Sequence, residues 1–364
     1  MEWIDAADPG RVHTEGRMAR VALEEARDRV AALVGTRSRQ VIFTSGATES
    51  INAAAYGALH AGRGERVVMA DVEHSAVREA SERYASSIVT IGVDRTGVID
   101  VDGVRESMSH PGVGLVQCQW ANHEVGTMQP VSDVVAACSE RGVLIHIDAA
   151  AAAGHVPIAF DDLGADLMSL SAHKLGGPRG IGALLVRRGL RVPPLLVGGA
   201  QERARRGGLE DVAAAVGFGA AAAQLAEDDR LGIEAAAANR QVSALRAAAL
   251  AIADVEAYGP LDERMRLPHL LCLGIGGVEA EPVLIGLDQA GVAAHSGSSC
   301  SSESLEPSPV LEAMGVDGER SLRFSVGWST TDADVQLAAR TLPEVVVRLR
   351  SLTAGGQGDA PPAL

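Results

Sequence analysis

Seven residues, SAHKLGG (171–177), place a histidine and a lysine between two apolar runs of the chain. ADLMSL precedes them and IGALLVRR follows shortly after, and both runs are typical of buried strands. A lysine in such a turn is either an ordinary surface residue or a buried amine that forms a Schiff base with a carbonyl compound. The rest of the chain must decide between these two interpretations of Lys174.

Three further groups with useful chemistry occur where a predicted strand gives way to a turn or helix. TSGATES (44–50) joins a strand to a helix, and free backbone N–H groups at a helix start can bind a phosphate. Asp148 ends the strand in IHID, at the edge where parallel sheets bind ligands. His74 opens a predicted helix. Taken singly, such residues are more commonly turns, caps or surface groups.

Taken together, these groups match the needs of one cofactor. Pyridoxal 5'-phosphate (PLP) requires a phosphate site, an amine, a carboxylate for its pyridinium nitrogen and a group packed on its ring. The TSGATES turn, Lys174, Asp148 and His74 supply the four in that order. The two glycines after Lys174 allow the backbone to turn tightly beneath it. The combination favours Lys174 as a Schiff-base lysine.

The elements that must position these residues alternate along the chain. Strands are predicted at 40–45, 65–70, 87–92, 113–120, 142–149, 166–171 and 181–188, and helices at 47–61, 74–85 and 131–142. This alternation favours a mostly parallel sheet covered on both faces. An alanine-rich region (210–255) is expected to be helical, with one helix that spans two domains. We predict a large domain at 1–235, a smaller C-terminal α/β domain at 236–352 and a disordered tail at 353–364.

Composition excludes several classes of protein. The 364 residues are 47% hydrophobic but only 3% aromatic, so the core must be aliphatic. A net charge of −15 argues against direct nucleic-acid binding. We find no signal peptide and no run of membrane-spanning length, and therefore expect a cytoplasmic protein. The scattered positions of Cys118, Cys138, Cys272 and Cys300 argue against a disulfide framework and against a metal site.

One cysteine lies in an unusual setting. HSGSSCSSESLEPS (295–308) is a polar stretch around Cys300, followed by LRFSVGWST (322–330). The plain interpretation is a flexible linker with a small buried residue. A cysteine exposed on such a polar loop could instead act as a nucleophile that moves toward the cofactor.

These motifs resemble the class I (NifS/IscS-type) cysteine desulfurases, in the class V aminotransferase group of fold type I PLP enzymes. The resemblance runs from about Asp8 to about Leu349. Its anchors, in the family's order, are FTSGATES, EHSAV, NHEVG, HIDA, SAHKLGGPRGIGALLVRR, GGAQERARRGGLED, SGSSCSSESLEPS and LRFSVG. It implies an α/β protein with the fold of a fold type I PLP-dependent transferase, which forms a homodimer.

The resemblance also implies a role for each matching residue. Lys174 would hold PLP covalently, Asp148 would keep the ring nitrogen protonated, and His74 would stack on the ring and handle protons. Arg323 would pair with the substrate carboxylate. Cys300 would take the sulfur of L-cysteine as a persulfide, leaving L-alanine, and pass it to an acceptor protein. Further contacts are implied to the phosphate for Ala47, Thr48, Ser171 and His173, and to the substrate for Asn122.

Three positions depart from the family's pattern. Ala151 replaces a glutamine that bonds the pyridine oxygen, and His123 replaces an asparagine that faces the cofactor; the His123 imidazole could reach the same oxygen. Leu209 replaces a threonine that reaches the phosphate across the dimer. The chain also opens near DPGRVH, without the family's usual first segment, so part of the small domain or of the site's wall is expected to be missing. A low-activity partner or scaffold protein, or another PLP reaction such as selenocysteine lysis or amino-acid epimerisation, therefore stands beside the desulfurase.

Overall fold

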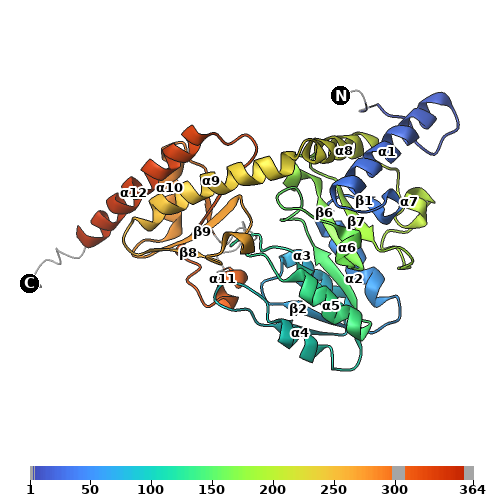
Figure 1. Ribbon diagram of the computed structural model, residues 1–364, viewed down its shortest axis with the longest axis horizontal. Coiled ribbons are helices and arrows are strands. Elements are labelled where there is room, and N and C mark those ends of the chain that lie inside the picture. The colour runs from blue at the N-terminus through green and yellow to red at the C-terminus, as the bar shows by residue number, and fades with distance from the viewer. Residues whose placement is uncertain (1–2, 4, 297–307, 356–364) are drawn as a thin grey trace, which may run out of the picture. The chain divides into compact units, whose positions relative to one another are not determined.

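The computed structural model of the chain describes residues 3, 5–296 and 308–355, and these divide into two compact units (Figure 1). Unit 1 consists of 1–94, 98–122 and 128–233. Unit 2 consists of 95–97, 123–127 and 234–364. Helix α9 (Arg230–Leu250) begins in unit 1 and ends in unit 2, as expected for a helix that spans two domains.

Unit 1 is built on a seven-stranded sheet in the order β1-β7-β6-β5-β4-β2-β3. Neighbouring strands are parallel, except that β7 is antiparallel to both β1 and β6. The predicted mostly parallel sheet is therefore confirmed. Its strands are β1 (Val41–Thr44), β2 (Arg66–Ala70), β3 (Ser87–Ile91), β4 (Val113–Gln119), β5 (Leu144–Asp148), β6 (Leu167–Ser171) and β7 (Gly182–Val186).

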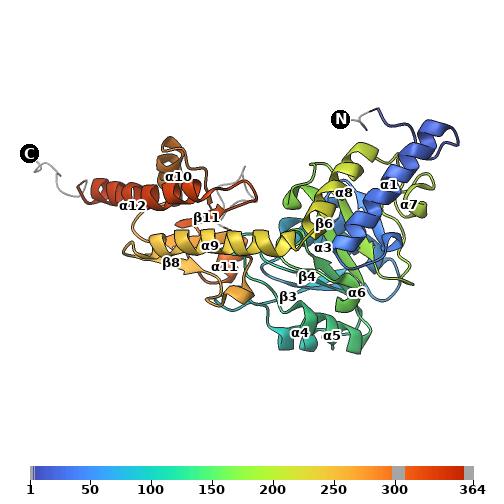
Figure 2. The ribbon, with the colours of Figure 1, turned by 45° about the horizontal axis from the view of Figure 1, so that its top comes forward.

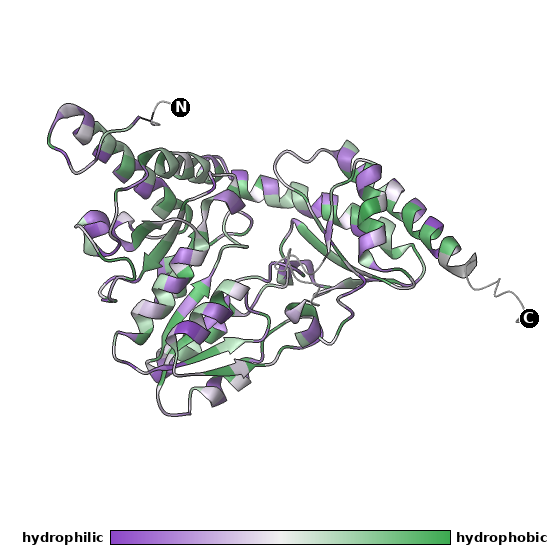
Figure 3. Ribbon diagram, turned by 180° about the vertical axis from the view of Figure 1, so that it is seen from behind, coloured by the Kyte–Doolittle hydropathy of each residue, from purple (hydrophilic) through white to green (hydrophobic). Residues whose placement is uncertain are grey.

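Helices cover the sheet because their apolar faces match its apolar strands. In Figure 3 the strands are largely hydrophobic, whereas the flanking helices alternate between hydrophobic and hydrophilic residues. Helices α2 and α3 pack on one face, against Leu115, Leu144 and Leu167 of successive strands. Helices α1 and α8 lie side by side, with Ala19 and Ala22 against Val212 (Figure 2). The helices of unit 1 are α1 (Thr14–Leu33), α2 (Ala47–Leu59), α3 (Ser75–Tyr84), α4 (Val101–Ser107), α5 (Val131–Arg141), α6 (Phe160–Leu163), α7 (Gln201–Ala204) and α8 (Val212–Ala226).

Unit 2 has a four-stranded antiparallel sheet in the order β10-β11-β9-β8. Alternate residues, among them Leu271, Leu273, Leu322 and Phe324, pack against α9, α10 and α12. The opposite side of the pleat carries Arg323, which is paired in register with Cys272. The elements are β8 (Val255–Tyr258), β9 (Leu270–Ile275), α10 (Ala280–Gln289), β10 (His295–Ser296), α11 (Pro309–Ala313), β11 (Ser321–Ser325) and α12 (Asp332–Gly355).

Helix α12 extends to Gly355, three residues into the stretch 353–364 for which the sequence predicts disorder. The helical period therefore continues through Thr353, despite the glycines that follow it. Residues 356–364 lie outside the described part of the chain. Among the described residues, every helix is too short or too polar to cross a lipid bilayer.

Candidate active site

The candidate residues of unit 1 follow the carboxyl ends of neighbouring strands. His74 follows β2, Asn122 follows β4, Asp148 ends β5 and Lys174 follows β6. Because these four strands are parallel and adjacent, their ends lie at one edge of the sheet. Ligands bind at this edge in open α/β sheets. Residues up to 100 positions apart in sequence therefore lie at the same edge of the sheet.

Lys174 lies in a single turn of 3₁₀ helix, Ala172–Leu175, directly after β6. Gly176 ends this turn with a φ of +86°, a left-handed conformation that favours glycine. The N–H of Gly177 then donates to the carbonyl of Ala172 at 2.9 Å. The predicted tight turn is confirmed, but Lys174 is exposed rather than buried. Within the turn, Ala172 and Leu175 are buried, whereas the side chains of His173 and Lys174 face outward.

Two features of this edge could hold a phosphate. The hydroxyl of Ser171 lies 3.0 Å from Nδ1 of His173. Burial, reinforced by the positive charges of Lys174 and Arg179, lowers the pKa of His173, so its ring is neutral at pH 7. While this bond holds, the pair has one hydrogen left to donate beside Lys174: Nε2–H of His173 if the hydroxyl donates to Nδ1, or the hydroxyl of Ser171 if Nδ1–H donates to it.

The second feature is the turn before α2, which includes Ala47 and Thr48 in the first helical turn. Gly46 precedes them, so no side chain covers the N–H groups at this helix start. A Cβ atom on Gly182 would lie 2.7 Å from Cα of Gly46 and 2.5 Å from the carbonyl oxygen of Leu170. The absence of side chains thus lets this turn approach the end of β6, where Ser171 pairs with Gly182.

Asp148 is buried, with only 8% of its surface exposed. Its Oδ1 accepts a hydrogen bond from the N–H of Ala150 at 3.0 Å, and its carbonyl accepts one from Trp120 at 2.7 Å. The carboxylate is therefore held at the strand end by its own turn and by the end of β4. Ala151 is half-buried in the same turn.

His74 caps helix α3 with its side chain. Nδ1 accepts a hydrogen bond from the N–H of Ala76 at 3.0 Å. Because a backbone N–H can only donate, the ring proton of the neutral imidazole is on Nε2. The amide of Asn122 donates to the carbonyl of Val72 at 3.2 Å, two residues before His74. The alternative interpretation of His74 as a helix cap is thus confirmed, and the cap orients the ring.

A buried polar network beneath this edge is absent from the sequence predictions. Gln117 donates to Ser81 at 2.8 Å and lies 2.8 Å from Nδ1 of His146, whose Nε2 is 2.7 Å from Ser169. Burial lowers the pKa of His146 to about 3, so the ring is neutral. His146 shares a pleat face with Asp148 because side chains alternate along a strand. Polar residues at every second position of otherwise apolar strands were the available signal.

In unit 2, Arg323 projects from β11. Its Nη1 donates to the carbonyl of His123 at 3.1 Å. Nε2 of His123 lies 3.5 Å from Oε1 of Glu124, and the buried Glu124 also accepts a hydrogen bond from Ser308 at 2.5 Å. Ser308 in turn caps helix α11. Cys300, the predicted nucleophile, lies outside the described residues.

The segment labelled α7 (Gln201–Ala204) is not a regular right-handed helix but a strained loop, and a buried ion pair holds it. Three consecutive non-glycine residues, Glu202, Arg203 and Ala204, have φ values of +48°, +59° and +61°. The Glu202 carboxylate accepts two N–H groups of Arg27, at 2.5 and 2.7 Å, and the N–H of Phe43 at 3.1 Å. Both charged side chains are only 2% exposed. These contacts account for the persistence of an unfavourable backbone conformation.

The same loop also reaches the turn before α2. Arg206 donates two hydrogen bonds to Glu49, at 2.9 and 3.2 Å. Glu49 accepts the N–H of Ser45 at 2.8 Å, so the loop fixes the first residue of the candidate phosphate turn. Leu209, three residues after Arg206, is 63% exposed.

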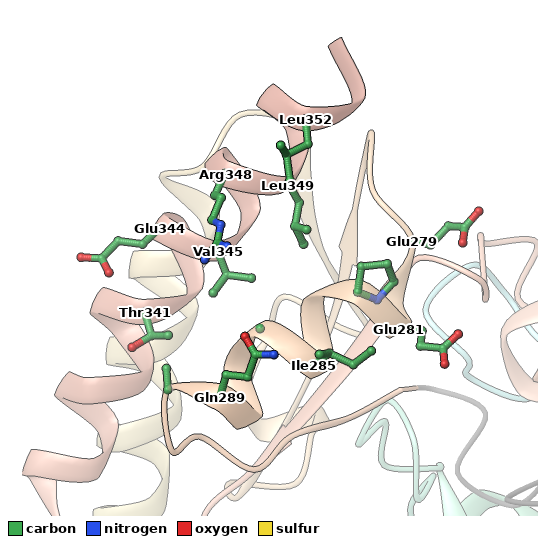
Figure 4. A pocket seen from close by; sticks show the side chains of 13 residues that line it. Glu279, Glu281, Ile285, Gln289, Thr341, Glu344, Val345, Arg348, Leu349 and Leu352 are labelled. Carbon is green, nitrogen blue, oxygen red and sulfur yellow. The ribbon is translucent and has the colours of Figure 1, made fainter. Parts of the chain in front are cut away.

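A groove on the surface of unit 2 is chemically unsuited to a phosphate cofactor. It lies between α10 and α12 with a volume of about 810 Å³, and its apolar lining includes Ile285, Val345 and Leu349 (Figure 4). Its charged lining consists of three glutamates and one arginine. An excess of carboxylates repels a phosphate, so the sheet edge of unit 1 is the better candidate.

Comparison with known proteins agrees with this geometry. The model of the aminotransferase class-V family matches residues 5–337. Cysteine desulfurase IscS of Dictyoglomus turgidum is 37% identical over 354 residues, which cover 95% of this chain and 89% of that protein. An IscS-like cysteine desulfurase of Mycobacterium tuberculosis is 38% identical over 95% of this chain and 91% of its own length.

Solved structures give the same result. The NifS-like protein of Rickettsia africae superposes with a TM-score of 0.85 at 26% identity, covering 94% of this chain and 93% of that one. The fold is therefore that of the fold type I PLP enzymes. The chain belongs to the aminotransferase class-V family, within its group of NifS/IscS-type cysteine desulfurases.

Proposed function

We propose that the protein converts L-cysteine to L-alanine and transfers the sulfur to Cys300 as a persulfide. The observation that carries this proposal is the placement of Lys174 and Asp148 after the adjacent strands β6 and β5, at the ligand-binding edge. The names of the curated relatives support the same reaction. The protein is thus a PLP-dependent enzyme that supplies sulfur.

The donor set at the sheet edge fits PLP. The amine matches the aldehyde of PLP, and the buried carboxylate matches its pyridinium nitrogen. The phosphate is matched by the uncovered helix start and by the Ser171–His173 pair. When bound, PLP supplies an electron sink for the bonds around the α-carbon of an amino acid. Lys174 would bind the cofactor and Asp148 would pair with its ring nitrogen. Ala47 and Thr48 would complete the phosphate site.

His74 would lie against the cofactor ring and move protons. Its Nδ1 accepts the N–H of Ala76, so the proton of the neutral ring is on Nε2. A fixed tautomer and a fixed ring orientation are what proton transfer at a stated atom requires. His123 and Asn122 would add contacts to the cofactor and the substrate, respectively.

Arg323 would bind the carboxylate of L-cysteine. A guanidinium group binds a carboxylate through two parallel N–H groups, which fixes the orientation of the substrate. The bond from Arg323 to the carbonyl of His123 uses Nη1 and positions the guanidinium.

The described cysteines are poor nucleophiles, which leaves Cys300 for sulfur transfer. Cys118, Cys138 and Cys272 are buried. Burial raises the pKa of both Cys138 and Cys272 to about 12, and that of Cys118 well above its ordinary value. The Cys300 thiolate would form an S–S bond with the substrate sulfur as the C–S bond breaks. The electron pair of the C–S bond would pass to the β-carbon, which would take up a proton. The products would be L-alanine and a Cys300 persulfide.

The protein would act in the cytoplasm as a homodimer, and a sulfur-acceptor protein would receive the persulfide. Iron–sulfur cluster assembly is one process that consumes such sulfur.

One observation favours the second candidate, a low-activity partner protein. Ala151 carries no hydrogen-bonding side chain, and the exposed Leu209 carries none at its position.

The test is the visible absorbance of the purified protein combined with product analysis. We expect a yellow protein, a loss of the lysine-bound cofactor in Lys174→Ala, and alanine production that is lost in Cys300→Ser while the yellow colour stays. Cys138→Ala is the matched control and should retain activity because its thiol is buried. Normal alanine production by Cys300→Ser would overturn its role, and a colourless, inactive wild-type protein would favour the low-activity partner.

A further inference from the structure

Unit 1 contains an arginine-lined cavity that the desulfurase reaction does not use. Its volume is about 380 Å³, within the usual range for small-molecule sites. Five arginines line it: Arg37, Arg39, Arg187, Arg188 and Arg205. An adjoining cavity of about 190 Å³ shares three of them. This concentration of positive charge is unexpected in a chain with a net charge of −15.

The cavity lies at the edge of the sheet opposite Lys174. Arg187 and Arg188 follow the end of β7, and Arg37 and Arg39 precede the start of β1. Because β7 is antiparallel to β1 and β6, its end lies beside the start of β1, as the pairing of Val41 with Leu185 requires. The start of β7 lies at the other edge, beside Ser171. The cavity is therefore separate from the candidate active site.

The positive charges of the cavity exceed the negative charges that face them. Arg187 is paired with Asp166, with both contacts at 2.8 Å. Asp161, in the adjoining cavity, accepts hydrogen bonds from Gln40 and Thr36. Five guanidinium groups minus these two carboxylates leaves three charges in excess.

The remaining arginines form no ion pair with any carboxylate among the described residues. Within the described part of the chain, the guanidinium groups of Arg37, Arg39 and Arg188 make neither an ion pair nor a hydrogen bond. Arg205 donates to backbone carbonyls only, those of Arg39, Val41 and Glu202. Burial, followed by the charge of Arg203, lowers the pKa of Arg205 to about 10, and the charge of Glu202 partly opposes this shift.

We propose that this cavity binds the di- or triphosphate group of a small ligand. Guanidinium groups bind phosphate oxygens in pairs, and several arginines converging on a concave site are suited to a compact polyanion. Three excess charges match the several negative charges of a pyrophosphate group better than the single charge of a carboxylate. A nucleic acid would instead require a basic stripe across the surface, which the acidic chain argues against.

The test is calorimetric titration of the PLP-saturated protein with inorganic pyrophosphate at low ionic strength. We expect saturable binding that weakens with added salt, because exposed charges are screened. Arg37→Gln and Arg188→Gln should each weaken binding about fivefold, and the double variant about 25-fold. Arg191→Gln is the matched control, since Arg191 is exposed but does not line the cavity.

The cofactor's visible absorbance, followed during the titration, separates this cavity from the phosphate site at the other edge. We expect it to stay constant as pyrophosphate binds. Pyrophosphate binding that is absent, that is unchanged in the double variant or that displaces the cofactor would overturn the proposal. Equal binding of a poly-glutamate peptide would also overturn it, because the cavity would then recognise acidic protein rather than phosphate.

Discussion

The buried pair of Arg27 and Glu202 allows a quantitative prediction for the substitution Glu202→Ala. Both side chains are 2% exposed, so the buried guanidinium would lose its two short contacts to Glu202. It would keep the carbonyl of Val41 at 3.1 Å and the more distant carboxylate of Glu24 at 3.5 Å. Removing one partner of a buried ion pair costs about 3–5 kcal/mol. The N–H of Phe43 would also lose its acceptor. Relaxation of the three left-handed residues would recover part of this loss.

Urea denaturation, followed by circular dichroism, measures the effect. With an m-value of about 3 kcal/mol/M, a loss of about 4 kcal/mol lowers the midpoint by roughly 1.3 M. The double variant Arg27→Met/Glu202→Leu should recover most of the loss, because well-packed apolar residues replace a buried pair at little cost. Arg264→Ala is the control: its 2.7 Å pair with Asp262 is exposed, so no measurable change is expected.

The reasoning would be refuted by a midpoint for Glu202→Ala within 0.3 M of wild type, roughly 1 kcal/mol at this m-value. It would also fail if the double variant were less stable than Glu202→Ala. The first result would show that the loop carries no stabilising anchor. The second would show that the hydrogen bonds of the ion pair hold the loop in a way that apolar side chains cannot replace.

Three further predictions concern the site. His146 is protonated below about pH 6.5 in the unfolded chain but only below about pH 3 in the native protein. Between these two pH values, acidification should therefore lower the stability of wild type relative to that of His146→Gln by about 1.4 kcal/mol per pH unit. Ala151→Gln and Leu209→Thr should slow cofactor loss on dialysis, and His123→Ala should speed it, each about tenfold, if these side chains contact PLP. Arg323→Lys should raise KM for L-cysteine about tenfold, since an ammonium group cannot pair bidentately.

Each of these predictions has a contrary result. Equal pH dependence of urea midpoints in wild type and His146→Gln would mean that the ring is protonated in the native state. Unchanged dialysis half-lives in all three pocket variants would mean that these positions do not contact PLP. A KM for Arg323→Lys equal to that of wild type would remove Arg323 from the substrate site.

The sequence predicted the seven strands of unit 1 and the helices α2, α3 and α5 because each is marked by local patterns, whereas helices α1, α4 and α6 were not predicted. Buried parallel strands are short apolar runs, and His74 and Asp148 stand where those runs end. The order of the strands, and the reversed direction of β7, could not be predicted from such patterns. Both depend on pairing between distant segments, such as Val41 with Leu185.

The candidate site was predictable where chemistry and position coincide in a motif, as for Lys174. Residues that act through tertiary contacts were not predictable. Arg27 looks like any polar residue of an amphipathic helix until Glu202, 175 positions away, is placed against it. The exposure of Lys174 was also missed, because burial depends on what covers a sheet edge and not on the neighbours in sequence.

The reversed direction of β7 has an electrostatic consequence. The strand begins beside the Lys174 edge and ends beside the arginine cavity, so its four residue steps of about 3.4 Å separate the two by roughly 14 Å. That distance exceeds the Debye length of about 8 Å at physiological ionic strength. Anions at the two exposed edges would therefore be screened from each other by the surrounding salt. A phosphate group bound at one end of the strands would therefore have little effect on the affinity for a phosphate group at the other end.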